Sequence, residues 1–243
     1  MQPTLEIIGF NIESCRVAQA AGANRIELCV NATEGGTTPS YGFIKAARQI
    51  LSVELYVMIR PRGGDFLYSD AEFQIMKTDV GLCKALGCDG IVTGLLSADG
   101  SVDTARCRQL VELAYPMGVT FHRAFDRVSH PFKALEDIIA TGCERILTSG
   151  QKPTAIEGAE MIKKLIEQAD KRIIIMPGSG VRADNIAAIA SQTNAVEFHT
   201  SARKFDETKM DFINDAMNED LNSITVDERE IRRMAELLNT LQH

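Results

Sequence analysis

Short β-prone runs alternate with longer helical segments eight times along this chain of 243 residues. The runs that we expect to form strands span residues 5–8, 25–29, 54–60, 90–93, 119–122, 145–148, 172–176 and 195–199. The helices are expected near residues 12–21, 41–50, 70–86, 103–114, 131–141, 154–169, 184–191 and 227–241. Such alternation is typical of parallel βαβ units, and eight units close into an α/β (β/α)8 TIM barrel.

The expected organisation is one TIM-barrel domain over residues 1–243, because this fold commonly occupies about 250 residues. An open doubly wound sheet is the alternative, but no Gly-x-Gly-x-x-Gly follows the first predicted strand. Residues from about 201 to 226 show no clear periodicity. We therefore expect a long loop there, before the last helix.

The composition argues against several classes of protein. A formal net charge of −7 argues against a nucleic-acid partner, and no basic helix indicates a membrane surface. No secretory signal and no apolar run of transmembrane length is visible. The six cysteines show no Cys-x-x-Cys spacing, which fits free thiols in a reducing compartment. These features predict a cytoplasmic protein.

Alternation along the predicted strands indicates which side chains face the barrel interior. Where apolar residues take the outer parity, the polar set left inside includes Glu6, Arg25, Glu27, Arg60, His122, Glu197 and His199. Burying so many charges is costly unless they are paired, and ordinary barrel interiors are aliphatic. An inert layer of paired Glu and Arg is one interpretation. A functional site is the better one, with Glu27, His122, Glu197 and His199 as catalytic acid–base candidates.

Several strand ends carry groups suited to an anionic ligand. Arg60 and Arg62 follow the third strand together with two glycines, which predicts either an anion clamp or a salt-bridge cluster. The loops after the seventh and eighth strands often cradle a phosphate in barrels, although plain glycine turns are the alternative here. The remaining candidates for substrate or anion binding are Arg123, Asp126, Ser149, Gly178, Gly180, Thr200 and Ser201.

A copper site is the alternative use of the interior. Cu(I) prefers thiolate and thioether ligands, which Cys29 and Met58 supply on inward positions, and His122 or His199 would add an imidazole. A small buried free cysteine is the plainer interpretation of Cys29. No Asp-x-Asp or His-x-His motif predicts a divalent-metal site, and no inward lysine predicts a Schiff-base enzyme.

Six ordered motifs between residues 25 and 202 resemble the CutC family. They occupy residues 25–29, 34–40, 60–70, 120–126, 147–150 and 197–202. The resemblance implies a (β/α)8 barrel, a cytoplasmic location, a role in copper homeostasis and homo-oligomers. Its motifs include Glu27, Cys29, Arg60, Arg62, Asp65, His122, Arg123, Asp126, Ser149, Glu197 and His199.

Two functions from different classes follow. The first is a copper-homeostasis protein that binds Cu(I) through Cys29, and the resemblance favours it. The second is a TIM-barrel enzyme, of lyase, isomerase or hydrolase type, that acts on a small anionic or phosphorylated metabolite. The inferred chemistry favours the second, because arginines repel metal cations and the interior holds more anion-binding and acid–base groups than soft ligands.

Overall fold

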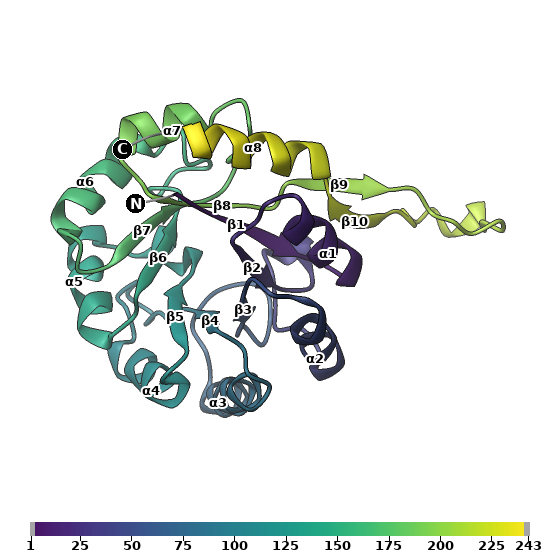
Figure 1. Cartoon of the computed structure of the whole chain (residues 1–243). Helices are drawn as coiled ribbons and strands as arrows, with labels where there is room; N and C mark the ends of the chain where they lie inside the picture. Colours follow the sequence, from purple (N-terminus) through teal and green to yellow (C-terminus); the bar gives the residue numbers. More distant parts are fainter. Residues whose placement is uncertain (1–2, 241–243) are drawn as a thin grey trace.

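Eight parallel strands form the centre of the molecule in a computed structural model that describes residues 3–240 (Figure 1). The strands are β1 (Thr4–Gly9), β2 (Arg25–Leu28), β3 (Glu54–Met58), β4 (Gly90–Thr93), β5 (Gly118–Phe121), β6 (Arg145–Thr148), β7 (Ile174–Pro177) and β8 (Glu197–Thr200). Their hydrogen-bonded order is β7-β6-β5-β4-β3-β2-β1-β8, and β7 also contacts β8. The predicted (β/α)8 TIM barrel is confirmed.

Helices surround the strands on the outside of the barrel (Figure 1). They are α1 (Ile12–Ala20), α2 (Tyr41–Ile50), α3 (Asp70–Ala85), α4 (Thr104–Ala114), α5 (Pro131–Thr141), α6 (Ala159–Ala169), α7 (Ile186–Thr193) and α8 (Glu228–Thr240). Local sequence sets several boundaries: Ser69 and Glu72 form a capping box at the start of α3, and Gly142 ends α5 with a φ of 91°. The predicted end of the last helix at residue 241 lies outside the described residues.

The outward parity of the strands builds the core between barrel and helices. Ile26, Leu28, Leu55 and Val57 are fully buried there, as the alternation predicts. The inward parity leaves Glu6, Arg25, Glu27, Arg60 and His122 almost fully buried as well. The barrel interior is therefore polar.

The segment between β8 and α8 differs from the expected long loop. It contains an antiparallel pair, β9 (Arg203–Asp206) and β10 (Ser223–Val226), with a short 3-10 helix at Asp215–Met217 between them. This hairpin projects away from the barrel in Figure 1. All four residues of β9 are exposed, so neither face imposes the alternation by which a strand is recognised in a sequence.

Two further expectations concern the cysteines and membranes. All six cysteines are free thiols, and each is buried. Within the part of the chain that the structure describes, no helix has the length and apolar character needed to cross a bilayer.

Candidate functional site

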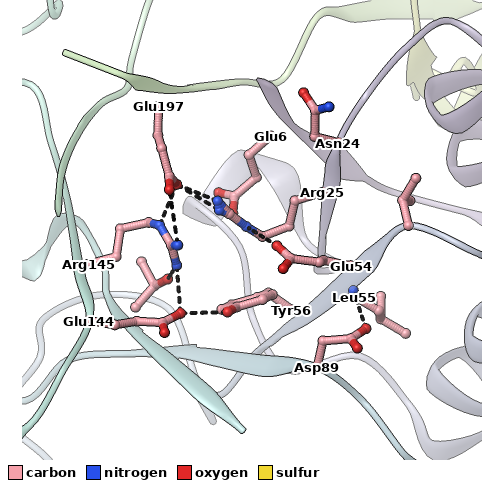
Figure 2. Close-up of polar contacts among 12 residues, drawn as sticks. Glu6, Asn24, Arg25, Glu54, Leu55, Tyr56, Asp89, Glu144, Arg145 and Glu197 are labelled. Carbon is pink, nitrogen blue, oxygen red and sulfur yellow. Dashed lines mark hydrogen bonds and ion pairs between the residues drawn. The ribbon is translucent and has the colours of Figure 1, made fainter. Parts of the chain in front are cut away.

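The end of the barrel at which the strands begin holds a layer of paired charges (Figure 2). Both guanidinium nitrogens Nη1 and Nη2 of Arg25 donate to Glu197, the former over 2.7 Å. Arg145 donates to the same carboxylate through Nε, at 2.6 Å, and through Nη2. Because Glu197 accepts from two buried arginines at once, its charge is fully compensated within the protein.

Tyr56 fills the space between these two arginines. Its ring lies 5.0 Å from the guanidinium carbon of Arg25 and 5.4 Å from that of Arg145, and its hydroxyl donates to Glu144. A Cβ atom at Gly90 would collide with the ring, and one at Gly118 would collide with the hydroxyl. These glycines let an aromatic ring enter the barrel and complete the layer by cation–π contacts.

A cavity of about 240 Å³ opens at the opposite end, where the strands finish. Ten of the predicted site residues line it: Glu27, Cys29, Met58, Arg60, His122, Arg123, Gly180, His199, Thr200 and Ser201. Active sites of TIM barrels occupy this end of the fold. The cavity is therefore the candidate functional site, and the residues of the charged layer are not part of its lining.

His122 lines the cavity and holds a hydrogen-bond donor that has no partner among the described residues. Its Nδ1 accepts from the backbone N–H of Ala124 at 3.2 Å, so a neutral ring carries its proton on Nε2. Nε2 is buried without a partner among the described residues. Burial, and then the charge of Arg60, lower the pKa of His122 to about 3, which keeps the ring neutral near pH 7.

Glu6, Glu27 and His199 come together at the wall formed by β1, β2 and β8. Nδ1 of His199 lies 2.7 Å from Oε1 of Glu6 and 3.4 Å from Oε2 of Glu27. Burial raises the pKa of Glu27 to about 7. Burial opposes the charge on His199, but Glu27 and Glu6 outweigh it and raise the pKa of the imidazole.

Cys29 and Met58 bring two sulfur atoms to the wall of the same cavity. A Cβ atom at Gly36 would lie 3.3 Å from Sγ of Cys29 and 3.4 Å from Cε of Met58. The two side chains therefore lie close together next to Gly36. The φ of 90° at this position favours glycine over residues with a side chain. Burial, and then Glu27, raise the pKa of the Cys29 thiol well above its ordinary value.

Arg60 donates hydrogen bonds to backbone carbonyl groups at the rim of the cavity. Its Nη1 donates to the carbonyl oxygens of Glu34 and Gly36, and its Nη2 donates to that of Gly64. Three of its N–H groups thus hold two loops at the rim together, and its buried Nε has no hydrogen-bond partner among the described residues. Arg60 builds the cavity wall and contributes positive charge to it.

The loops after β7 and β8 contribute backbone to the cavity. Ser179 and Gly180 both adopt positive φ angles, 79° and 70°, and they line the cavity with Thr200 and Ser201. Gly178 serves packing instead, because a Cβ atom there would collide with Leu147.

Four predicted residues lie outside the cavity lining besides Gly178: Arg62, Asp126, Ser149 and Glu197. Arg62 turns away toward Glu72 and Asp65, since β3 ends at Met58 and strand alternation no longer applies. Asp126 accepts from Arg123, Thr148 and three groups of residues 149–151, which fixes the rim around Ser149. Glu197 belongs to the charged layer.

Other residues of the site were given no catalytic or binding role from the sequence, although Glu6 was expected in the barrel interior. Glu6 is fully buried against His199, and its inward parity on the first strand was the available signal. The inward position of Arg145 could be inferred in the same way, because the neighbouring apolar residue Ile146 takes the outward position on the strand. Ser179 lines the cavity from the loop after β7, and Arg203 lines it from the start of β9, whose exposed residues show no alternation.

Comparison with known proteins shows the family to which this chain is related. The CutC family model matches residues 4–204. A CutC family protein of Chromobacterium violaceum is 56% identical over 203 residues, covering 84% of this chain and 82% of the relative. A human copper homeostasis protein cutC homolog is 47% identical over 213 residues, covering 88% and 78%.

A solved structure extends the agreement from sequence to fold. The CutC crystal structure from Streptococcus agalactiae superimposes with a TM-score of 0.79 at 37% identity, covering 82% of this chain and 98% of that one. The span matched by the family model, residues 4–204, contains all six motifs. This chain belongs to the CutC family.

Proposed function

We propose that this protein acts in copper homeostasis in the cytoplasm and that its cavity binds Cu(I) as cargo. The human and mouse relatives, each 47% identical, bear the name copper homeostasis protein cutC homolog. Six free cysteines fit a reducing compartment, in which copper is handled as Cu(I).

The convergence of Cys29 and Met58 beneath Gly36 carries this proposal. A thiol and a thioether on one wall are the donors that Cu(I) prefers over harder cations. The nearby carboxylate of Glu27 supplies negative charge that would offset the metal, whereas Arg60 and Arg123 on other parts of the lining oppose it. Because the Cys29 thiol is held protonated, binding would displace its proton.

Anaerobic titration of Cu(I) against a chromophoric chelator tests the proposal. The wild-type chain should remove one Cu(I) from the chelator. Cys29→Ser should abolish this, and Met58→Leu should weaken it, since it keeps the volume but removes the sulfur. Cys143→Ser is the matched control, because that thiol is also buried but does not line the cavity. Full binding by Cys29→Ser would refute the site.

The size of the cavity favours a second candidate function, that of an enzyme acting on a small anionic metabolite. The cavity volume of about 240 Å³ is several times the volume of about 30 Å³ that one water molecule occupies in the liquid. The Nε2–H of His122 would donate to a substrate oxygen, and Arg123 and Arg203 would attract its charge.

Thermal denaturation in the presence of phosphorylated metabolites distinguishes this candidate. A ligand of the cavity should raise the melting temperature of the wild-type chain but not of His122→Gln. The Cys29→Ser variant should retain that shift, because neither the imidazole nor the arginines change. An equal shift in His122→Gln would exclude the proposed donor.

A further inference from the structure

Glu27 is a buried carboxylate whose charge nothing nearby fully compensates. Its side chain is 3% exposed, and Oε2 accepts no hydrogen bond from the described residues. Its one ion-pair neighbour within that part of the chain is Nδ1 of His199, at 3.4 Å. A buried carboxylate oxygen that accepts no hydrogen bond is costly, and a cation beside it would remove that cost.

We propose that Glu6, Glu27 and His199 form a site for a divalent transition-metal cation such as Zn²⁺. One ligand atom from each of these residues lies within 4.8 Å of the other two. The proposal goes beyond the copper function and does not depend on Cys29 or Met58.

The distances from His199 to the two carboxylates are close to those between ligands of one metal ion. Ligands about 2.0–2.2 Å from a zinc ion are separated from one another by about 3.0–3.5 Å at octahedral or tetrahedral angles. The distances from Nδ1 of His199 to the two carboxylates are 2.7 and 3.4 Å. A displacement of a few tenths of an ångström at Glu6 would replace the hydrogen bond between His199 and Glu6 by coordination.

The donors also select the class of metal. Two carboxylate oxygens and one imidazole nitrogen suit Zn²⁺, Mn²⁺ or Fe²⁺, whereas Cu(I) prefers sulfur. Oε2 of Glu6 is already 3.0 Å from Nε of Arg25, so Glu6 is held in place from the side of the charged layer. This contact resembles the outer-shell support that metal ligands commonly receive.

The cavity gives the proposed ion an open side. Glu27 and His199 both line the cavity, while Glu6 lies behind them. Three protein ligands with the remaining positions open are typical of zinc ions that contact a bound molecule, whereas structural zinc sites have four protein ligands. A ligand in the cavity would then be able to reach the metal.

Calorimetric titration of Zn²⁺ into the metal-free full chain tests the inference. We expect one ion per chain, with an affinity that falls at least about tenfold in Glu27→Gln. Two control variants should retain wild-type affinity for zinc. They are Cys29→Ser and Glu136→Gln, which changes a surface carboxylate that is ion-paired with Arg172. Glu27→Asp keeps the charge on a shorter side chain and should bind zinc with intermediate affinity.

Each other outcome overturns the proposal. Absence of zinc binding by the wild-type chain, or equal affinity in Glu27→Gln, would exclude the site. Loss of binding in Cys29→Ser with retention in Glu27→Gln would assign the zinc to the thiol instead. Should Glu27→Gln fail to fold, an anomalous map of zinc-soaked wild-type crystals must show the ion beside Nδ1 of His199, and density elsewhere would refute the assignment.

Discussion

The two ends of the barrel interior differ in how completely buried charge is paired. At the end where the strands begin, Glu197 accepts from both Arg25 and Arg145 (Figure 2). In the charged layer, Nε of Arg25 has no hydrogen bond among the described residues but lies 3.0 Å from Oε2 of Glu6. At the other end, Oε2 of Glu27 and Nε2 of His122 have no hydrogen-bond partner among the described residues. Satisfied groups stabilise a fold, whereas unsatisfied buried groups are retained at a cost that a ligand can remove. The comparison separates a structural layer from a binding site.

Glu197→Gln should have the largest effect on stability. It leaves two buried guanidinium groups facing a neutral amide, and breaking a buried ion pair in this way costs about 3–5 kcal/mol. Urea denaturation measures the change. Glu54→Gln is the control, because the exposed carboxylate of Glu54 lies 3.5 Å from Nε of Arg25, one of the two arginines that contact Glu197. Equal losses in the two variants would remove the distinction between the layer and the surface.

Acidification should destabilise the protein through His122. The pKa of its ring is about 3 in the folded chain and near 6.5 in the unfolded one, so the unfolded state binds more protons between these values. Stability is complete above pH 6.5 and falls as the pH decreases, by about 2 kcal/mol between pH 7 and pH 5. Denaturation curves of His122→Gln should lack this component. An unchanged pH dependence would show that His122 is not held neutral.

Tyr56→Phe should cost about 1 kcal/mol, because it removes one hydrogen bond to Glu144 and keeps the ring between the arginines. Thermal and urea denaturation would both register this loss. A loss as large as that of Glu197→Gln would mean that the hydroxyl, and not the shared carboxylate, holds the layer together.

Glu27→Gln should change the free energy of unfolding by less than about 1 kcal/mol, because Oε2 has no hydrogen bond to lose. The same chemical substitution is thus expected to be severe at Glu197 and mild at Glu27. Parallel urea curves of the two variants make the comparison directly. A loss of several kcal/mol at Glu27 would place that residue in the structural layer.

Much of the fold could be predicted because its signals are local. Alternation along single strands identified the outer set Ile26, Leu28, Leu55 and Val57, and with it the inward charges. Residues on neighbouring strands were also expected to share an interior, because parallel strands align their ends.

The division of that interior into two layers was not predictable from the sequence. Glu197 and His199 have the same parity on β8, yet one meets Arg25 and Arg145 while the other meets Glu6 and Glu27. Strand stagger decides this, and no local pattern encodes it. For Arg62 the sequence left an anion clamp and a salt-bridge cluster open, and the structure pairs it with Glu72 and Asp65.

An anomalous difference map at the copper absorption edge, from crystals grown anaerobically with Cu(I), tests the central claim that the unsatisfied end of the barrel is the binding site. The map should show one strong peak in the cavity, within bonding distance of Sγ of Cys29 and beside Met58. Copper bound at other thiols or on the surface, with none in the cavity, would contradict the account.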